Sequence, residues 1–211
     1  MLHLTATPAY ATGVYDIPPL PSDGTSWIID DADIISRANA GQLSRKLSTL
    51  AQDTGTEVRF VTIRRLDYGE TIDSFANQLF EMWFPTTAEQ ANQVLVVLDS
   101  VTNNSTIRTG PSVKEMMADD IAASVANETI QVPLRQGDKY NQALLDASDR
   151  LVAVLSGQPD PGPPVVESTI NAESTFTSAE DTDQGNATII VVGFLAAATI
   201  IPMVTYYWYV R

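Results

Sequence analysis

The side chains that could support chemistry in this chain of 211 residues are oxygen ligands. The chain contains no cysteine, and its single histidine is His3, close to the N-terminus. Thiolate chemistry, zinc sites built on cysteine or histidine, and nucleophilic catalysis with an imidazole base are therefore excluded for the body of the chain. Carboxylates, hydroxyls and backbone carbonyls remain, and these are the ligands of hard cations such as calcium and magnesium.

Carboxylates follow two predicted strands and lie on one predicted helix. Asp30 follows the first strand, Asp99 ends an apolar run, and Asp119 lies on the helix after Gly110. If the two strands are parallel, Asp30 and Asp99 emerge at the same edge of the sheet, where ligands usually bind. Clustered carboxylates repel one another, and a bound cation relieves the repulsion. We therefore predict a calcium or magnesium site from these carboxylates: Asp30, Asp99 and Asp119, with Asp31 and Asp120 as secondary candidates.

The alternative role of these carboxylates is local. Asp33 sits just ahead of a predicted helix and Asp99 lies at a turn, where aspartates commonly cap backbone amides. Two other ligand classes are excluded or unsupported. The formal charge of −14 repels nucleic acid. No glycine-rich dinucleotide fingerprint or P-loop string is present, so nothing supports nucleotide binding.

Alternating strand and helix patterns over residues 27–155 must position these carboxylates. Strands are predicted at 27–29, 56–65, 93–99 and 105–109, and helices at 36–53, 72–83, about 112–127 and 139–155. Ser36 is the predicted N-cap of the first helix, and Gly55 ends it. A helix between the second and third strands predicts a parallel crossover, and the short turn after Asp99 predicts a hairpin. The fold class is therefore α/β: an α/β/α sandwich with a mixed central sheet.

The two ends of the chain indicate export and anchoring. Residues 1–11 carry Ala9-Tyr10-Ala11, typical of the tail of a signal peptide; an ordinary N-terminus is the alternative. Residues 12–26 are predicted to be an extended lead-in, and residues 156–187 a linker rich in proline, serine, threonine and acids. Residues 188–210 carry no charge and are predicted to form a transmembrane helix. Arg211 follows its aromatic end, which places the C-terminus in the cytoplasm and the domain outside.

Several strings in this order resemble the TPM domain family over residues 27–155. They are WIIDDADIIS, GTEVRFVTIRRL, IDSFANQLFEMWF, NQVLVVLD, IRTG and VPLRQGDKYNQALLDASDRL. By this resemblance Asp30, Asp99, Asp119 and the Thr109-Gly110 step match the positions of family motifs. One departure is that Gln93 stands where many members have a glycine before the apolar strand.

The resemblance implies a domain in the thylakoid lumen or periplasm, with a part in photosystem II repair. A plant relative is described as an acid phosphatase, and some relatives bind calcium. We therefore expect a single-pass thylakoid membrane protein that serves as a non-catalytic accessory factor in photosystem II repair, assembly and photoprotection. Its expected partners are photosystem II subunits or assembly intermediates and the thylakoid membrane. The alternative is a metal-dependent acid phosphatase of the thylakoid lumen.

Overall fold

The computed structural model describes residues 11–21, 26–165 and 184–210. The chain divides into two compact units, Met1–Val166 and Glu167–Arg211, and each is described by itself. The residues outside the described ranges are 1–10 of the expected signal-peptide tail, 22–25 of the expected lead-in, 166–183 of the expected linker, and Arg211.

A four-stranded mixed sheet forms the centre of the first unit. Its strands are β1 (Ile28–Asp30), β2 (Glu57–Ile63), β3 (Gln93–Asp99) and β4 (Ser105–Thr109), in the spatial order β1-β2-β3-β4. β1, β2 and β3 run parallel, and β4 pairs with β3 antiparallel. The predicted crossover and the predicted hairpin are both confirmed. β3 contains a continuous apolar run, Val94–Leu98, and six of the seven residues of β2 are buried, because helices cover both faces of these strands.

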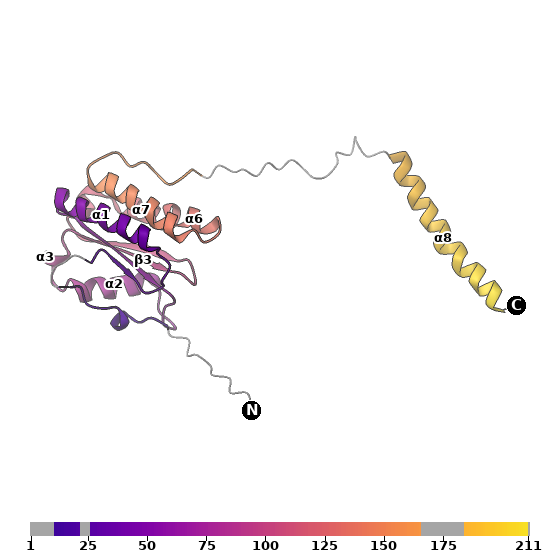
Figure 1. The fold of residues 1–211 in the computed structure, drawn as a ribbon, viewed down its shortest axis with the longest axis horizontal. Helices are drawn as coiled ribbons and strands as arrows, with labels where there is room; N and C mark the ends of the chain where they lie inside the picture. The colour runs from indigo at the N-terminus through magenta and orange to yellow at the C-terminus, as the bar shows by residue number, and fades with distance from the viewer. Residues whose placement is uncertain (1–10, 22–25, 166–183, 211) are drawn as a thin grey trace, which may run out of the picture. The chain divides into compact units, whose positions relative to one another are not determined.

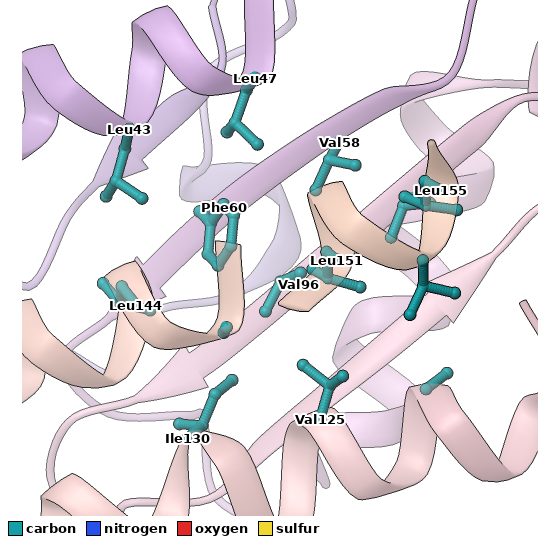
Figure 2. Packing of buried hydrophobic residues seen from close by; sticks show 14 of the residues in the cluster. Leu43, Leu47, Val58, Phe60, Val96, Val125, Ile130, Leu144, Leu151 and Leu155 are labelled. Atoms are coloured by element: carbon teal, nitrogen blue, oxygen red, sulfur yellow. The ribbon is translucent and has the colours of Figure 1, made fainter. Parts of the chain in front are cut away.

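Helices α1 (Arg37–Thr54) and α7 (Tyr140–Leu155) cover one face of the sheet (Figure 1). Leu43 and Leu47 of α1 lie at helical spacing and are fully buried. Figure 2 shows these side chains and those of α7 gathered around Phe60 of β2 and Val96 of β3. This face carries the larger of the two hydrophobic clusters, so it contributes most of the apolar burial in the domain.

Helix α2 (Ile72–Trp83) lies on the opposite face of the sheet (Figure 1). The apolar side of this helix is buried against Val61 and Leu95 and consists of Phe75, Leu79 and Phe80. The short helix α3 (Thr87–Gln90) follows it and leads into β3. Helices on both faces of one mixed sheet confirm the predicted α/β/α sandwich.

The predicted cap of the first helix is confirmed. The Ser36 hydroxyl accepts a hydrogen bond from the Asn39 amide at 3.3 Å. Gly55 ends the helix with φ at 74°, in the left-handed region that glycine adopts at little cost. These two residues fix where the chain leaves β1 and where it enters β2.

The prediction of one helix over residues 112–127 is wrong. The segment contains α4 (Val113–Met116), α5 (Asp119–Ser124) and a π-helical turn, η2 (Val125–Thr129), and it continues into α6 (Gln131–Arg135). Met117 interrupts it with an extended backbone and a fully buried side chain, so core packing overrides helical continuity there. Helical structure also continues past residue 127, beyond the predicted end.

The lead-in over residues 12–26 is also less extended than predicted. It contains a 3₁₀ turn, η1 (Val14–Asp16). Val14 and Ile17 are buried in the cluster beneath α2, and Thr12 pairs with Leu66. The first part of the lead-in, residues 12–17, is therefore part of the packed domain, because Val14 and Ile17 join the cluster around α2.

The second unit contains α8 (Gln184–Val210). Its segment Ile189–Tyr209 has 21 residues and a mean hydropathy of 2.2, and none of it is buried within the described structure. It is the one helix among the described residues that is long and apolar enough to cross a membrane. A helix of membrane-span length is therefore present where the sequence predicts one.

Candidate functional site

Three loops meet at the edge of the sheet where β1 and β3 end. They are the loop 31–36, the turn 100–104 and the segment 137–141 at the start of α7; we call this region the carboxyl edge. Each loop contains a residue other than glycine with positive φ: Asp33 at 54°, Asn103 at 57° and Asp138 at 52°. No other residue of this kind occurs in the described part of the chain. Such conformations cost free energy and persist where surrounding contacts fix them.

Asp30 fixes the first of these loops. Its carboxylate accepts hydrogen bonds from the amides of Ile34 at 3.1 Å and Ile35 at 2.8 Å. It also accepts a hydrogen bond from the Thr62 hydroxyl on the neighbouring strand. The adjacent Asp31 accepts one from the Thr12 hydroxyl at 3.0 Å, which ties the lead-in to the loop. Both carboxylates therefore act as local backbone and loop anchors.

Asp99 fixes the second loop. Its side chain is buried, and Oδ1 accepts hydrogen bonds from the amides of Val101 at 2.8 Å and Thr102 at 3.2 Å. The apolar strand β3 ends on a carboxylate because that carboxylate closes the turn into β4. The local alternative considered for Asp99 therefore matches the observed contacts.

Asp30 and Asp99 end strands at the same edge but do not meet. Strand β2 lies between them, so they are separated by two strand spacings, about 9–10 Å. Asp30 is paired with Thr62, whereas Asp99 is paired with Ile63, one residue further along β2. Because successive residues of a strand point to opposite faces, the two aspartates also belong to opposite faces of the sheet.

The start of α7 joins the two loops through side chains that were not among the predicted ligands. The Tyr140 hydroxyl lies 2.9 Å from the Ser100 carbonyl and 2.9 Å from Asn103 Oδ1. Asn103 Nδ2 donates to Asp138 Oδ1 at 3.0 Å. Burial, followed by the charge of Asp138, raises the pKa of the Tyr140 hydroxyl, so it stays protonated and available as a donor.

Asn141 completes the junction on the side of β1. Its Oδ1 accepts hydrogen bonds from the Ser36 amide and from Asn39 Nδ2, both at 2.8 Å. Its Nδ2 donates to the Ile34 carbonyl at 3.1 Å. The signal that could have found these residues is the GDKYN string, since polar residues ahead of a helix are suited to bonding with neighbouring loops.

Asp119 and Asp120 lie away from the carboxyl edge, at the start of α5. Asp119 forms an ion pair with Lys114 at 2.9 Å, and Asp120 is exposed. Within the described ranges, no group of three or more histidine, aspartate or glutamate side chains is arranged to hold a metal ion. The structure therefore does not gather the five predicted ligands into one centre, and a cation at the carboxyl edge stays a prediction.

A second polar region lies along β4, which forms one edge of the sheet. A groove with a volume of about 720 Å³ runs beside it, between the start of α2 and the segment α5–α6; we call it the β4 groove. Three basic side chains line it: Arg108, Lys114 and Arg135. Arg108 lies over the Phe80 ring, with 5.4 Å between its guanidinium carbon and the ring centroid.

Gly110 fixes the end of β4 against α3. A Cβ atom at this position would lie 1.8 Å from the Gln90 carbonyl oxygen and 2.6 Å from that of Ala91, which is impossible without backbone movement. Only glycine permits this approach. The Thr109-Gly110 step therefore sets one end of the β4 groove.

Fold and site together define an α/β/α domain. Side-chain hydrogen bonds join the loops at its carboxyl edge, and β4 is an edge strand of its sheet. Residues 28–154 match the TPM domain, so the chain belongs to the TPM domain family. It is 34% identical over 187 residues to a chloroplastic UPF0603 protein of Arabidopsis thaliana, a match covering 88% of this chain and 65% of that protein. A chloroplastic UPF0603 protein of Oryza sativa subsp. indica is 32% identical over 187 residues, covering 88% of this chain and 62% of the rice protein. The chain thus spans just under two thirds of these relatives.

Two solved structures confirm the fold. The N-terminal domain of a protein from P. gingivalis superposes with a TM-score of 0.64 at 19% identity, covering 70% of this chain and 94% of that domain. The N-terminal domain of a protein from Corynebacterium glutamicum superposes with a TM-score of 0.51 at 12% identity, covering 74% of this chain and 93% of that domain. At these identities the likeness concerns the fold alone.

Proposed function

We propose that this protein is a membrane-tethered accessory factor for photosystem II repair, assembly and photoprotection. It is a single-pass protein of the thylakoid membrane, with the TPM domain in the lumen and the C-terminus in the cytoplasm. Its partners are photosystem II subunits or assembly intermediates. Membership of the TPM domain family and the chloroplastic relatives support this placement.

The observation that carries the proposal is the exposed apolar helix α8. A helix of this hydropathy in a water-soluble domain would be buried, whereas every described side chain from Ile189 to Tyr209 lies outside a protein core. Tyr206, Tyr207 and Trp208 at its C-terminal end form an aromatic belt of the kind found at a membrane interface. A tether of this kind raises the effective concentration of the domain near membrane partners.

The contacts at the carboxyl edge support a structural role for Asp30 and Asp99, in keeping with a non-catalytic factor. Asp30 and Asp99 each use their oxygens to hold backbone amides of their own loops. A phosphoester assay on the full chain, comparing the wild type with Asp99→Asn, tests the enzymatic alternative. Turnover in the wild type that disappears in the variant would replace the accessory role with a lumenal phosphatase.

Calorimetric titration of calcium into the full chain tests the predicted cation site, with Asp30→Asn and Asp99→Asn measured alongside. Heat that is lost in both variants would place a hard cation at the carboxyl edge. No heat in the wild type would leave both carboxylates as loop anchors.

The decisive experiment for the proposed function is performed in a photosynthetic host from which the gene has been deleted. We expect slower recovery of photosystem II activity after strong light, and restoration by the full chain but not by a chain that ends before α8. An affinity-tagged full chain is expected to co-purify with photosystem II from solubilised thylakoids. Equal recovery with and without the gene would overturn the proposal.

A further inference from the structure

Strand β4 presents unpaired backbone groups to the β4 groove. The Asp99 amide donates to the Asn104 carbonyl at 2.9 Å, and the Gly110 amide donates to the Gln93 carbonyl at 2.8 Å. Alternate residues of an antiparallel strand bond to the partner strand. These two hydrogen bonds therefore show that the residues that face β3 are Asn104, Thr106, Arg108 and Gly110. The amides and carbonyls that point outward belong to the intervening residues: Ser105, Ile107 and Thr109.

The centre of this outer edge is free to pair. Ser105 directs its hydroxyl to the Ala126 carbonyl at 2.8 Å, and the Thr109 carbonyl accepts from Arg108 Nη1 at 3.1 Å. The amide and carbonyl of Ile107 have no hydrogen-bond partner in the described ranges. An unpaired strand edge of this kind is a template for an added strand.

The shape of the β4 groove suits an extended segment. All five residues of β4 line it, so it follows the strand for about 17 Å at about 3.4 Å per residue. Its walls come from both layers of the sandwich: Asp73 of α2 on one side, and α5 and α6 on the other. The walls bury Ser105 and Thr109 at the two ends of the edge strand and leave its centre, including Ile107, partly exposed.

The charge of the β4 groove is opposite to that of the chain. It is lined by three basic side chains and by two carboxylates, Asp73 and Asp119, in a chain with a formal charge of −14. Asp73 accepts from the Thr106 hydroxyl at 2.6 Å, and Asp119 is paired with Lys114. Arg135 has no acidic partner among the described residues, so positive charge remains available to a ligand.

We propose that the β4 groove binds an extended acidic peptide segment of a partner protein, which adds to β4 as a fifth strand. Its backbone pairs with Ile107, and its carboxylates face Arg135. Backbone pairing supplies affinity, and charge supplies specificity. This proposal rests on the proposed function, because it names the surface by which a lumenal accessory factor holds its partner.

Three capped peptides of about eight residues test the proposal on the full chain in detergent micelles. The first alternates threonine and glutamate, the second carries lysine in place of glutamate, and the third is the acidic peptide with alternate amides N-methylated. We expect the acidic peptide to bind at least about tenfold more tightly than either of the others, because only it offers carboxylates together with a complete set of amide hydrogens. Hydrogen exchange at the Ile107 amide is expected to slow only with this peptide.

A matched pair of variants locates the site. Arg135→Glu is expected to weaken binding of the acidic peptide about tenfold or more. Arg64→Glu makes the same charge change at an exposed residue outside the groove and is expected to weaken it less than about twofold. Equal weakening by both variants would mean that overall charge, not the groove, attracts the peptide.

Other outcomes also overturn the inference. No binding to the wild type, equal binding of the acidic and lysine peptides, or equal binding of the N-methylated peptide would each contradict strand addition at β4. The proposed function can fail separately. Peptide binding without any association with photosystem II would refute only the photosystem role, and association that Arg135→Glu leaves intact would refute only the groove.

Discussion

The carboxyl edge and the β4 groove are both polar borders of the same sheet, but their hydrogen-bonding groups are used differently. At the carboxyl edge, the side chains of Asp30, Asp99 and Asn141 form hydrogen bonds with the backbone of the neighbouring loops. At the β4 groove, the backbone of Ile107 and the charge of Arg135 have no partner among the described residues. A cluster of acidic residues in the sequence can therefore serve loops as well as a ligand, whereas backbone groups left without a partner at an edge strand become visible only in the fold.

The largest effect is expected when the β4 groove loses the glycine that fixes its end. Gly110→Ala should lower the free energy of unfolding by about 3 kcal/mol, because the new Cβ would overlap the Gln90 carbonyl oxygen and force the backbone apart. Urea unfolding followed by circular dichroism measures the loss.

Gly41→Ala in helix α1 is the matched control for that substitution. Its Cβ would meet only Arg45 Nη1 at 3.5 Å, an ordinary contact. Alanine in a helix interior gains about 0.5–1 kcal/mol over glycine, so the opposite sign is expected. If Gly110→Ala were as stable as the wild type, the close approach of β4 to α3 would be incorrect.

The next largest loss of stability is expected at the carboxyl edge, on substitution of Asp99. Asp99→Ala is expected to cost about 2–3 kcal/mol, because the amides of Val101 and Thr102 lose a buried charged acceptor. Asp99→Asn retains an amide oxygen and should cost about 1 kcal/mol. Thermal and urea unfolding compare the two variants. Binding of the acidic peptide to Asp99→Asn should equal that of the wild type, and a clear loss would show that the two regions are coupled.

A smaller effect is expected for the hydroxyl that joins the loops of the carboxyl edge. Tyr140→Phe removes the contacts to Ser100 and Asn103 and should cost about 1 kcal/mol at neutral pH. The raised pKa of Tyr140 means that the folded state holds this proton more tightly than the unfolded chain. Its contribution is therefore complete below the unfolded value of 10.0 and is lost as pH rises through the folded pKa. Urea unfolding between pH 8 and about 11 should show the difference between wild type and variant shrinking; a constant difference would contradict it.

The smallest effect concerns the helical wall of the β4 groove. Arg150 is buried, donates to Ser124 and Thr129 of that wall, and forms two hydrogen bonds with Asp160. Asp160→Asn should cost about 0.5 kcal/mol at pH 7, since Asp160 is partly exposed. The Arg150 hydrogen bonds lower the pKa of the Asp160 carboxyl, so this stability is present above its ordinary value of 3.8 and is lost as pH falls through the folded pKa. Unfolding measured from pH 7 to about pH 3 should converge for the two proteins; divergence would exclude this ion pair as the cause.

Local sequence signals predicted the elements that local physics controls. The bounds of β3 and β4, the start of α1 at Ser36 and its end at Gly55 all follow from apolar runs, a capping hydroxyl and a glycine in the left-handed region. The helix predicted over 112–127 failed because burial of Met117 outweighs helical propensity, and a sequence window does not show which core contact Met117 will make. The lead-in was predicted to be extended for the same reason, since Val14 and Ile17 find their partners on α2, far along the chain.

The candidate site also combines features that local sequence signals predict with features that depend on long-range packing. The sequence by itself indicated that Asp30 and Asp99 follow strands and would share one edge of the sheet if those strands were parallel, and the structure shows that they are. The sequence also determined the acidic charge, the exclusion of thiolate chemistry and the apolar helix near the C-terminus. Only the tertiary structure decided that β2 separates the two aspartates, that Asp119 belongs to another border, and that the start of α7 joins two loops. Only it decided that β4 is an edge strand beside a basic groove. Strand register and the meeting of distant loops are long-range relations, and the residues that create them carry no local mark of the partner they will meet.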